Sequence, residues 1–304
     1  MWQDEVTAKY KKNLVLANLV ISIDHVGKKG DVIHLPSAAR SSASNIFGSQ
    51  GSVLSFQVAT ETETTLTINQ HWVNAKQIPD VVEMQALGSL RRFYTDDLGY
   101  SLAVAQDSYL WTTARLLAGA SADAGAVIGS DGSTAWDSTA NTNTGNGAAL
   151  TDAGLRKLIQ TLDDIDVPGT DRYLVIPPVE KNRLLGISRF TEQAFTGESG
   201  GSNSIRNGYV GDIYGTPVYV SSNSPTVQAT DASTNYRLVL YAHKEAMALA
   251  TQMKPRVQAQ MKLEALSDIL VADVLFGAAV IKTTASGTSN SNTLDRGRIA
   301  FVPA

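Results

Sequence analysis

A serine in a glycine-rich segment is the clearest candidate for enzymatic chemistry in the sequence. The segment 197–201 reads GESGG, which fits the G-x-S-x-G pattern around Ser199. Asp212 or Asp231 and then His243 follow in the chain order of an α/β-hydrolase triad. Such a serine must lie on a sharp turn between a strand and a helix, and the surrounding run of Gly, Ser and Asn favours neither element. A serine hydrolase that uses Ser199 and His243 is therefore a distant alternative.

Acidic and histidine residues give weaker signs of a metal site. Asp163, Asp164 and Asp166 lie where an expected helix ends before Pro168-Gly169, and solvated turn aspartates are common at such places. Two further sets lack the ligand spacing of a calcium loop or a zinc-binding helix: Asp123, Asp131 and Asp137, and His25, His34, His71 and His243. No Walker lysine or dinucleotide fingerprint is present. We expect no catalytic residue, no metal and no cofactor.

Composition also argues against a dedicated nucleic-acid binder and against a disulfide-bonded protein. The 304 residues are 43% hydrophobic, enough to fill a core, and the net charge is -4, whereas nucleic-acid binders usually present a basic face. The absence of cysteine excludes disulfides and thiolate metal sites, and it suits assembly in a reducing cytoplasm. No apolar run approaches the roughly eighteen residues of a membrane-spanning helix, so no membrane partner is expected.

The apolar run 14–23 follows three lysines and so imitates the start of a signal peptide. Asn18 and Ser22 interrupt this run, and Asp24-His25 stand where small residues should mark a cleavage site. The run is therefore interpreted as a strand or an extended arm.

Residues 31–75 alternate between apolar and polar side chains, as strands do. The apolar positions are Val32, Ile33 and Leu35 on the way out, and Leu66, Ile68 and Trp72 on the return. Each arm of this hairpin reaches roughly 60 Å at strand rise, whereas a globule of this length has a radius of gyration of about 19 Å. We expect the hairpin to bury its apolar residues on a neighbouring subunit, and a hairpin folded back on its own domain is the alternative.

A long helix is predicted after the hairpin. Pro79-Asp80 with Glu83 has the form of a capping box, which predicts a helix over 81–94 that carries Arg91 and Arg92. A second start at Thr95 precedes apolar residues at helical spacing over 97–118, about 22 residues or roughly 33 Å of helix. The arginine pair and the lysines of the arm are the notable basic groups, and a solvated face is favoured over DNA contact.

The second half of the chain alternates between helices and strands. Residues 119–148 are nearly all small or polar, which indicates a surface excursion and a boundary. Beyond it the sequence predicts a helix that Thr151 caps and that carries Leu155, Leu158, Ile159 and Leu162 on one face. A strand over 173–176 and a helix from Pro177-Pro178 to Leu185 follow. The remaining predicted elements are two short strands within 209–220, a strand from Tyr236 and a last strand over 278–283. Apolar and polar residues alternate between Val257 and Ala265, so one face of that strand is expected to be buried.

The order of these parts resembles that of tailed-bacteriophage major capsid proteins. Three phrases are similar to phrases that recur in that family: ALTDAGLR at 149–156, RYLVIPP at 172–178 and VADVLFG at 271–277. The resemblance extends along nearly the whole chain and implies an α+β protein with the Hong Kong 97-type fold. It divides the chain into an N-terminal arm (1–30), an extended hairpin loop (31–75), a first part of the peripheral domain with a spine helix (76–148), an axial domain (149–235) and the return of the peripheral domain (236–304).

The resemblance implies a structural protein, not an enzyme, that assembles with itself into hexamers and pentamers of an icosahedral phage head around double-stranded DNA. A separate scaffolding protein and a portal protein are implied partners, a cement protein is a further one that the resemblance allows, and contact with DNA would be weak and local. The protein would be assembled in the cytoplasm of the bacterial host and reside in the virion capsid. An encapsulin-type shell shares the fold and is the closer alternative. The expected subunit contacts lie on the hairpin: Arg40, Phe47, Phe56, Glu61 and Glu63.

Two departures from the best-known member of that family carry expectations. That member cross-links its shell through a lysine on the hairpin loop, and residues 37–70 hold no lysine here, so we expect no covalent cross-link. The chain begins at Met1 without a long helical prefix, so the N-terminus is expected to remain untrimmed.

Overall fold

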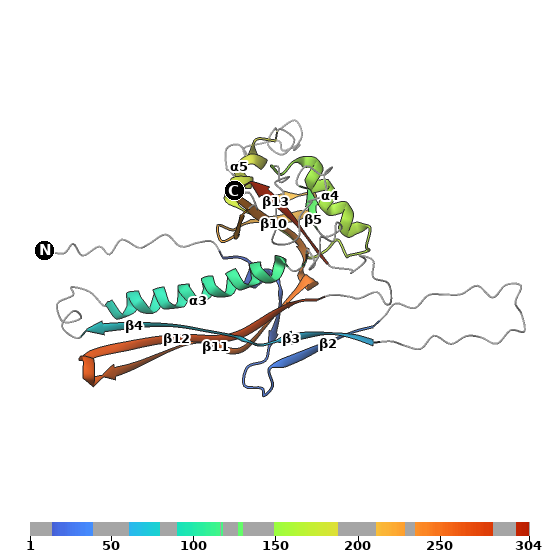
Figure 1. Ribbon diagram of the computed structural model, residues 1–304. Helices are drawn as coiled ribbons and strands as arrows, with labels where there is room; N and C mark the ends of the chain where they lie inside the picture. Colours follow the sequence, from blue (N-terminus) through green and yellow to red (C-terminus); the bar gives the residue numbers. More distant parts are fainter. Residues whose placement is uncertain are drawn as a thin grey trace, which may run out of the picture.

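Two sheets organise the chain (Figure 1). A four-stranded sheet with the order β1-β11-β12-β4 lies beside a long helix, and a seven-stranded sheet with the order β5-β13-β10-β6-β8-β7, with β9 next to β10, forms the other body together with two shorter helices. The predicted α+β class is confirmed. The computed structural model describes residues 14–38, 61–79, 90–115, 117, 127–129, 149–187, 211–228, 235–281 and 296–303. Within these ranges, no helix has the length and apolar character that crossing a membrane requires.

The four-stranded sheet is built on three long strands. Its strands are β1 (Ile21–Asp24), β4 (Gln70–Pro79), β11 (Met247–Lys262) and β12 (Ser267–Val280). β11 and β12 form a hairpin that turns at the 3-10 helix η3 (Leu263–Ala265), and β4 pairs antiparallel with β12. β1 pairs in parallel with the inner end of β11 only, between Ala248 and Thr251. The outer half of β11 therefore forms an edge of the sheet among the described residues.

Helix α3 (Leu90–Arg115) lies along one face of this sheet (Figure 1). Its 26 residues span about 39 Å at the usual rise. Tyr109 of the helix meets Phe276 of β12 edge to face, with ring centroids 5.7 Å apart. The side chains that the helix buries in the core are Leu98, Leu102, Leu110, Trp111 and Ala114. The helix thus packs a continuous apolar stripe against the face of the sheet that carries Phe276 of β12.

The long helix begins earlier than the sequence predicts. A separate start at Thr95 is wrong, because this residue lies inside α3, as does the arginine pair 91–92. Tyr94 packs against the core one turn before Leu98, so the apolar stripe continues across the cap-like threonine. Burial in the tertiary structure therefore overrides the local capping signal. The predicted start near Asp80 lies outside the described residues.

The root of the predicted hairpin is confirmed. β2 (Val32–Ala38) pairs antiparallel with β3 (Glu61–Thr67), from Val32 opposite Thr67 to Ala38 opposite Glu61. Trp72, expected on the returning arm, belongs instead to β4 and lies opposite Val274 of β12. The assignment of Trp72 is wrong because the chain changes partners just after Ile68, and β4 completes the ladder of the long sheet.

A glycine allows the hairpin root to cross the long sheet at close range. A Cβ atom added to Gly277 of β12 would lie 2.8 Å from the Ile68 Cα and closer still to the Thr67 carbonyl oxygen. Leu66 and Ile68 are buried there beside Ala248 and Ala250 of β11. The absence of a side chain at position 277 therefore permits the backbone contact that fixes the hairpin to its own subunit.

The N-terminal arm is anchored in the core of its own chain at residues 16–24. The short helix α1 (Leu16–Leu19) buries Leu16 completely, and β1 follows it into the long sheet. The prediction of a strand within 14–23 is confirmed for β1, and the helical turn before it was not foreseen. Residues 1–13 lie outside the described part of the chain.

The second body contains the elements predicted for residues 149–220. Its helices are α4 (Asp152–Asp163) and α5 (Pro178–Leu185), and its strands are β5 (Val127–Gly129), β6 (Arg172–Ile176), β7 (Asp212–Ile213), β8 (Thr216–Val220), β9 (Thr226–Gln228), β10 (Asn235–His243) and β13 (Gly297–Pro303). Thr151 caps α4 as predicted, with its hydroxyl accepting from the Gly154 amide at 3.1 Å. The view of 119–148 as a surface excursion is wrong at β5, which pairs in parallel with β13.

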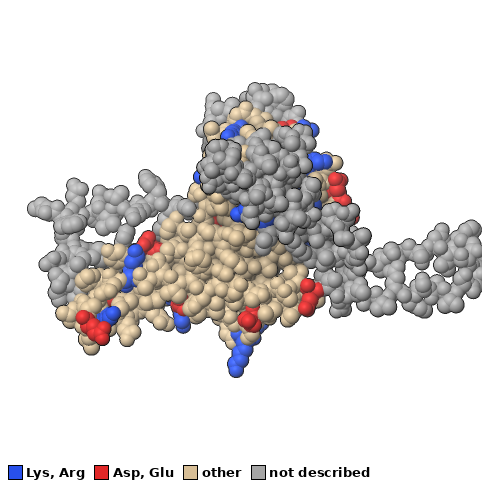
Figure 2. All heavy atoms as spheres, in the orientation of Figure 1, with Lys and Arg blue, Asp and Glu red and all other residues tan. Residues whose placement is uncertain are grey.

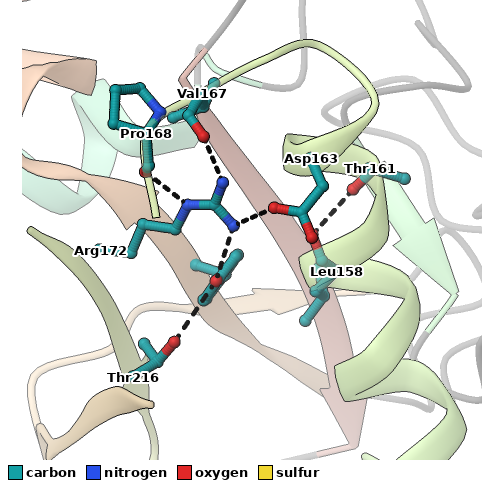
Figure 3. A network of polar contacts seen from close by, with 8 residues as sticks. Leu158, Thr161, Asp163, Val167, Pro168, Arg172 and Thr216 are labelled. Atoms are coloured by element: carbon teal, nitrogen blue, oxygen red, sulfur yellow. Dashed lines mark hydrogen bonds and ion pairs between the residues drawn. The ribbon is translucent and has the colours of Figure 1, made fainter. Parts of the chain in front are cut away.

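Arg172 fastens the end of α4 to the second sheet (Figure 3). Its guanidinium donates to the carbonyl oxygens of Val167 and Pro168, pairs with Asp163 at 2.7 Å and reaches the Tyr241 hydroxyl at 3.5 Å. Asp163 therefore belongs to an ion pair. No group of three metal-ligating side chains occurs in the described ranges. These hydrogen bonds satisfy the carbonyl oxygens of Val167 and Pro168 and hold the turn after α4 near Tyr241 of β10.

Candidate self-association surface

The outer half of β11 is exposed on both faces. Residues 247–250 at its inner end are buried, whereas every residue from Lys254 to Lys262 is exposed. The expectation that one face of this strand is buried is therefore wrong for a single chain. β1 ends at Asp24, so β12 is the one described strand that pairs with the outer half of β11, and the other edge of that half is open among the described residues. An alternating strand without a covering layer is the usual form of a surface that another molecule covers.

Four apolar side chains at this end of the sheet form an exposed group that we call the tip patch. It consists of Val257 and Met261 of β11, Leu263 of η3 and Leu266 before β12, with exposed fractions of 46%, 50%, 76% and 66%. Val257 lies opposite Ala272, which is buried in the core that α3 covers, so Val257 and Met261 project from the same face of the sheet as the helix. Val257 and Met261 therefore extend outward along β11 the apolar face that α3 covers on β12.

The backbone at Leu266 supports a function for this patch. Leu266 adopts φ 42° and ψ 57°, the left-handed conformation that glycine and asparagine occupy at lower cost. A large apolar residue is thus kept in a strained turn while two thirds of its surface faces solvent. Strain of this kind usually persists where the side chain has a role.

A charged row crosses the other face of the sheet and joins its three long strands. Arg256 of β11 forms two hydrogen bonds with the Asp273 carboxylate of β12, at 2.8 and 3.0 Å, and His71 of β4 lies 3.4 Å from the same carboxylate. The hydrogen bonds from Arg256 hold the pKa of Asp273 below its usual range. This row stabilises the outer part of the sheet next to the tip patch.

The predicted contact residues on the hairpin fall partly within the described chain. Glu63 lies on an exposed face of β3 and pairs with His34 of β2 at 3.1 Å. Glu61 begins β3, opposite Ala38. The remaining three, Arg40, Phe47 and Phe56, lie outside the described residues. The tip patch was not among the predicted contact residues, although the alternation around Val257 predicted an apolar face on this strand.

Charged side chains leave a broad uncharged surface between them. Figure 2 shows Lys, Arg, Asp and Glu mainly at the margins of the lower body in that view, with a wide uncharged area in the middle. Such a surface suits contact with protein better than contact with phosphate.

The hydrolase alternative finds no support in the geometry of His243. This residue is only 6% exposed, and its Nδ1 accepts a hydrogen bond from the Glu245 amide at 3.2 Å, capping the 3-10 helix η2 (Lys244–Ala246). In a catalytic triad the same atom would face a carboxylate. Asp212 lies in β7, while Ser199 and Asp231 lie outside the described residues.

Solved structures share this architecture over almost their whole length. A chain from Mycobacterium phage Che8 is similar with a TM-score of 0.73 and 19% identity, covering 99% of this chain and 95% of that one. The capsid of Ralstonia phage GP4 gives 0.71 and 12%, covering 100% and 94%, and the cyanophage Pam1 capsid gives 0.71 and 13%, covering 100% and 96%. No curated protein matches. The fold is thus that of phage capsids, the Hong Kong 97 type.

The sequence places the chain in the same class. A family model described as phage capsid protein matches residues 80–285, more than half of the chain. The protein belongs to this phage capsid protein family. It is a major capsid protein, a structural component of the virion that associates with itself, and not an enzyme.

Proposed function

We propose that the chain forms the hexamers and pentamers of an icosahedral phage head around double-stranded DNA, and that the tip patch and the hairpin are its main self-contacts. The observation that carries this proposal is the tip patch. Four large apolar residues, one of them in a strained turn, remain exposed at the end of the long sheet. Covering them in an assembly would release water from apolar surface and favour association.

The hairpin supplies the second proposed contact. Ile33 and Leu35 pack at its root against the buried pair Leu66 and Ile68, and the ladder continues outward to Ala38 opposite Glu61. The root of the hairpin is thus fixed to its own chain by both apolar packing and strand pairing. Arg40, Phe47 and Phe56 in the segment 39–60, and Glu61 and Glu63 at its base, remain the proposed contact residues.

Charge supports a contact between the hairpin of one copy and the sheet end of another. Glu63 is an exposed acidic residue at the hairpin base, while Lys254, Arg256 and Lys262 lie exposed along the outer half of β11. Opposite charges on two surfaces steer association and help to fix its register. Glu63 already forms an exposed pair with His34, and such a pair is easily exchanged for another.

We also propose the domain division, the partners and the place of assembly that the resemblance to phage capsid proteins implies. Residues 31–75 would be the extended loop, 76–148 and 236–304 the peripheral domain, 149–235 the axial domain and 1–30 the arm. The partners would be a separate scaffolding protein, a portal protein and DNA through weak local contacts, and the fold also allows a cement protein on the outside. Assembly would take place in the host cytoplasm, without covalent cross-links between subunits.

Expression of the chain alone, and of a variant lacking residues 41–51, tests this function. Negative-stain microscopy should show shells or capsomers for the full chain, whereas the variant should give a soluble chain that forms no shells. Purified full-length protein that stays at one-chain mass under all conditions would contradict the proposal. Mass spectrometry of denatured particles should show only single-chain masses, and DNA inside phage particles would distinguish a head from an encapsulin-type shell.

A further inference from the structure

A buried carboxylate joins three segments that are far apart in the sequence. Asp107 of α3 is 1% exposed, and its Oδ1 accepts from the backbone amide of Leu16 at 3.1 Å. Its Oδ2 accepts from the Nδ2 of Asn223 at 2.9 Å. We call these three residues the Asp107 junction. It connects the arm, the long helix and the segment that follows β8.

The segment 221–224 is itself fixed to the second sheet. The hydroxyl of Ser224 donates to the Leu238 carbonyl at 2.9 Å and lies 3.2 Å from the Leu238 amide, which donates to it. The Asn223 amide donates to the Ser221 hydroxyl at 3.2 Å. Ser221, Asn223 and Ser224 are all buried, and the two hydrogen bonds between Ser224 and Leu238 hold this short polar turn against β10.

A continuous polar path therefore runs from β10 to the arm. It passes from Leu238 through Ser224 and Asn223 to Asp107, and from there to the amide of Leu16, which is followed by β1 in the other sheet. Burial raises the pKa of Asp107, which reflects the cost of holding a charge there, and the hydrogen bonds offset part of this cost. A carboxylate is suited to this place because it accepts from both sides at once, whereas an amide presents only one acceptor.

We infer that Asp107 is a positioning residue that couples the N-terminal arm to the second body, so that the hold on Leu16 depends on where Asn223 lies. Asn223 orients the carboxylate, and the oriented carboxylate holds the root of the arm. Displacement of the second body relative to α3 removes the orienting donor and loosens the arm root. In a self-assembling chain this makes the exit of the arm respond to the arrangement of the two bodies. The inference concerns one chain and does not depend on the contact surfaces proposed above.

An exchange of the two side chains tests the coupling without changing volume. Asn223→Asp places two carboxylates face to face and should raise the amide exchange rate of a peptide covering residues 14–24 by about tenfold or more. The double variant Asp107→Asn/Asn223→Asp restores one donor and one acceptor in reversed order, since the new amide oxygen can accept from Leu16 while its NH2 donates to the new carboxylate. Protection of the arm root should return to within about twofold of the wild type.

Ser108→Ala is the matched control. The Nδ2 of Asn223 also donates to the exposed Ser108 hydroxyl at 3.0 Å, so this variant removes a neighbouring hydrogen bond and leaves Asp107 untouched. Its exchange over residues 14–24 should equal that of the wild type. Hydrogen exchange followed by mass spectrometry on the unassembled chain measures all four proteins. Failure of the exchanged pair to restore protection, or normal protection in Asn223→Asp alone, would overturn the inference.

Discussion

Two strands of this molecule differ sharply in their surroundings. β6 in the second body is buried at all five positions, while the outer half of β11 is exposed at every position from 254 to 262. β6 lies between β10 and β8 and is held at its start by Arg172, whereas outer β11 has only β12 as a neighbour among the described strands. β6 is thus paired on both edges and buried within one chain, whereas the outer half of β11 remains exposed among the described residues.

The largest effect is expected where the long sheet meets the hairpin root. Gly277→Val would drive a branched side chain into the backbone of Thr67 and Ile68, because a Cβ atom already lies too close to both. We expect a loss of about 3 kcal/mol or more in the free energy of unfolding. Urea denaturation measures it. Gly99→Ala is the control, since a Cβ at Gly99 of α3 meets nothing within 4 Å and should stabilise the helix by about 1 kcal/mol. Equal stability of the Gly277→Val variant and the wild type would refute the proposed crossing.

Removal of the Arg172 side chain should destabilise the second body. Arg172→Ala leaves the carbonyl oxygens of Val167 and Pro168 without their donor and removes the link to Tyr241. We expect a loss of about 2 kcal/mol in the free energy of unfolding. Arg172→Lys should recover only part of it, because an ammonium group does not reproduce the planar fork. Thermal and urea unfolding measure both variants, and full recovery by lysine would argue against the fork geometry.

The charged row of Arg256, Asp273 and His71 should make the stability of the long sheet depend on pH. The pKa of Asp273 is lowered in the folded chain, so its pair with Arg256 contributes stability above the unfolded pKa of about 4, and this contribution is lost as the pH falls through the lower folded pKa. Asp273→Asn should therefore be less stable than the wild type at pH 7, and the difference should shrink in acid. Arg256→Gln should reduce the same difference. Parallel stability curves of wild type and Asp273→Asn between pH 7 and pH 2 would contradict this account.

Replacement of Leu266 in the turn of the tip patch should have a smaller effect on the free energy of unfolding, and it should stabilise the isolated chain. Leu266→Asn places a residue that tolerates the left-handed conformation at φ 42° and removes an exposed apolar side chain. The isolated chain should gain about 1 kcal/mol of stability, while its assembly into shells should become weaker. Differential scanning fluorimetry and sedimentation measure the two quantities. A variant that lost stability would show that Leu266 packs within its own chain.

Local patterns predicted much of the second body and only part of the long sheet. Thr151, the apolar face of α4 and the β7–β8 hairpin were predicted because caps, periodicity and turn residues act within a few positions. The helix start predicted at Thr95 was wrong, because Tyr94 packs against a sheet that is formed mainly by residues after 246. β5 was missed, since three residues in a small and polar segment gain their ladder from β13 at the far end of the chain.

Local sequence patterns likewise predicted only part of the candidate contact surface. The alternation around Val257 revealed an apolar face but not its cover, since no described element of the chain provides that cover. Asn223 and Ser224 gave no recognisable signal, because their importance arises from contacts with α3 and β10 that only the fold creates.

Assembly of the double variant Met261→Ser/Leu263→Ser is the most direct test of the central claim. Both side chains are at least half exposed, so the free energy of unfolding of the single chain should change by less than about 0.5 kcal/mol. The paired control, Gln258→Ser/Gln260→Ser at exposed positions of the same strand, should assemble as the wild type does. Electron microscopy and sedimentation should show normal shells for the control and only unassembled, folded chain for the tip variant. Normal shells from the tip variant would contradict the account.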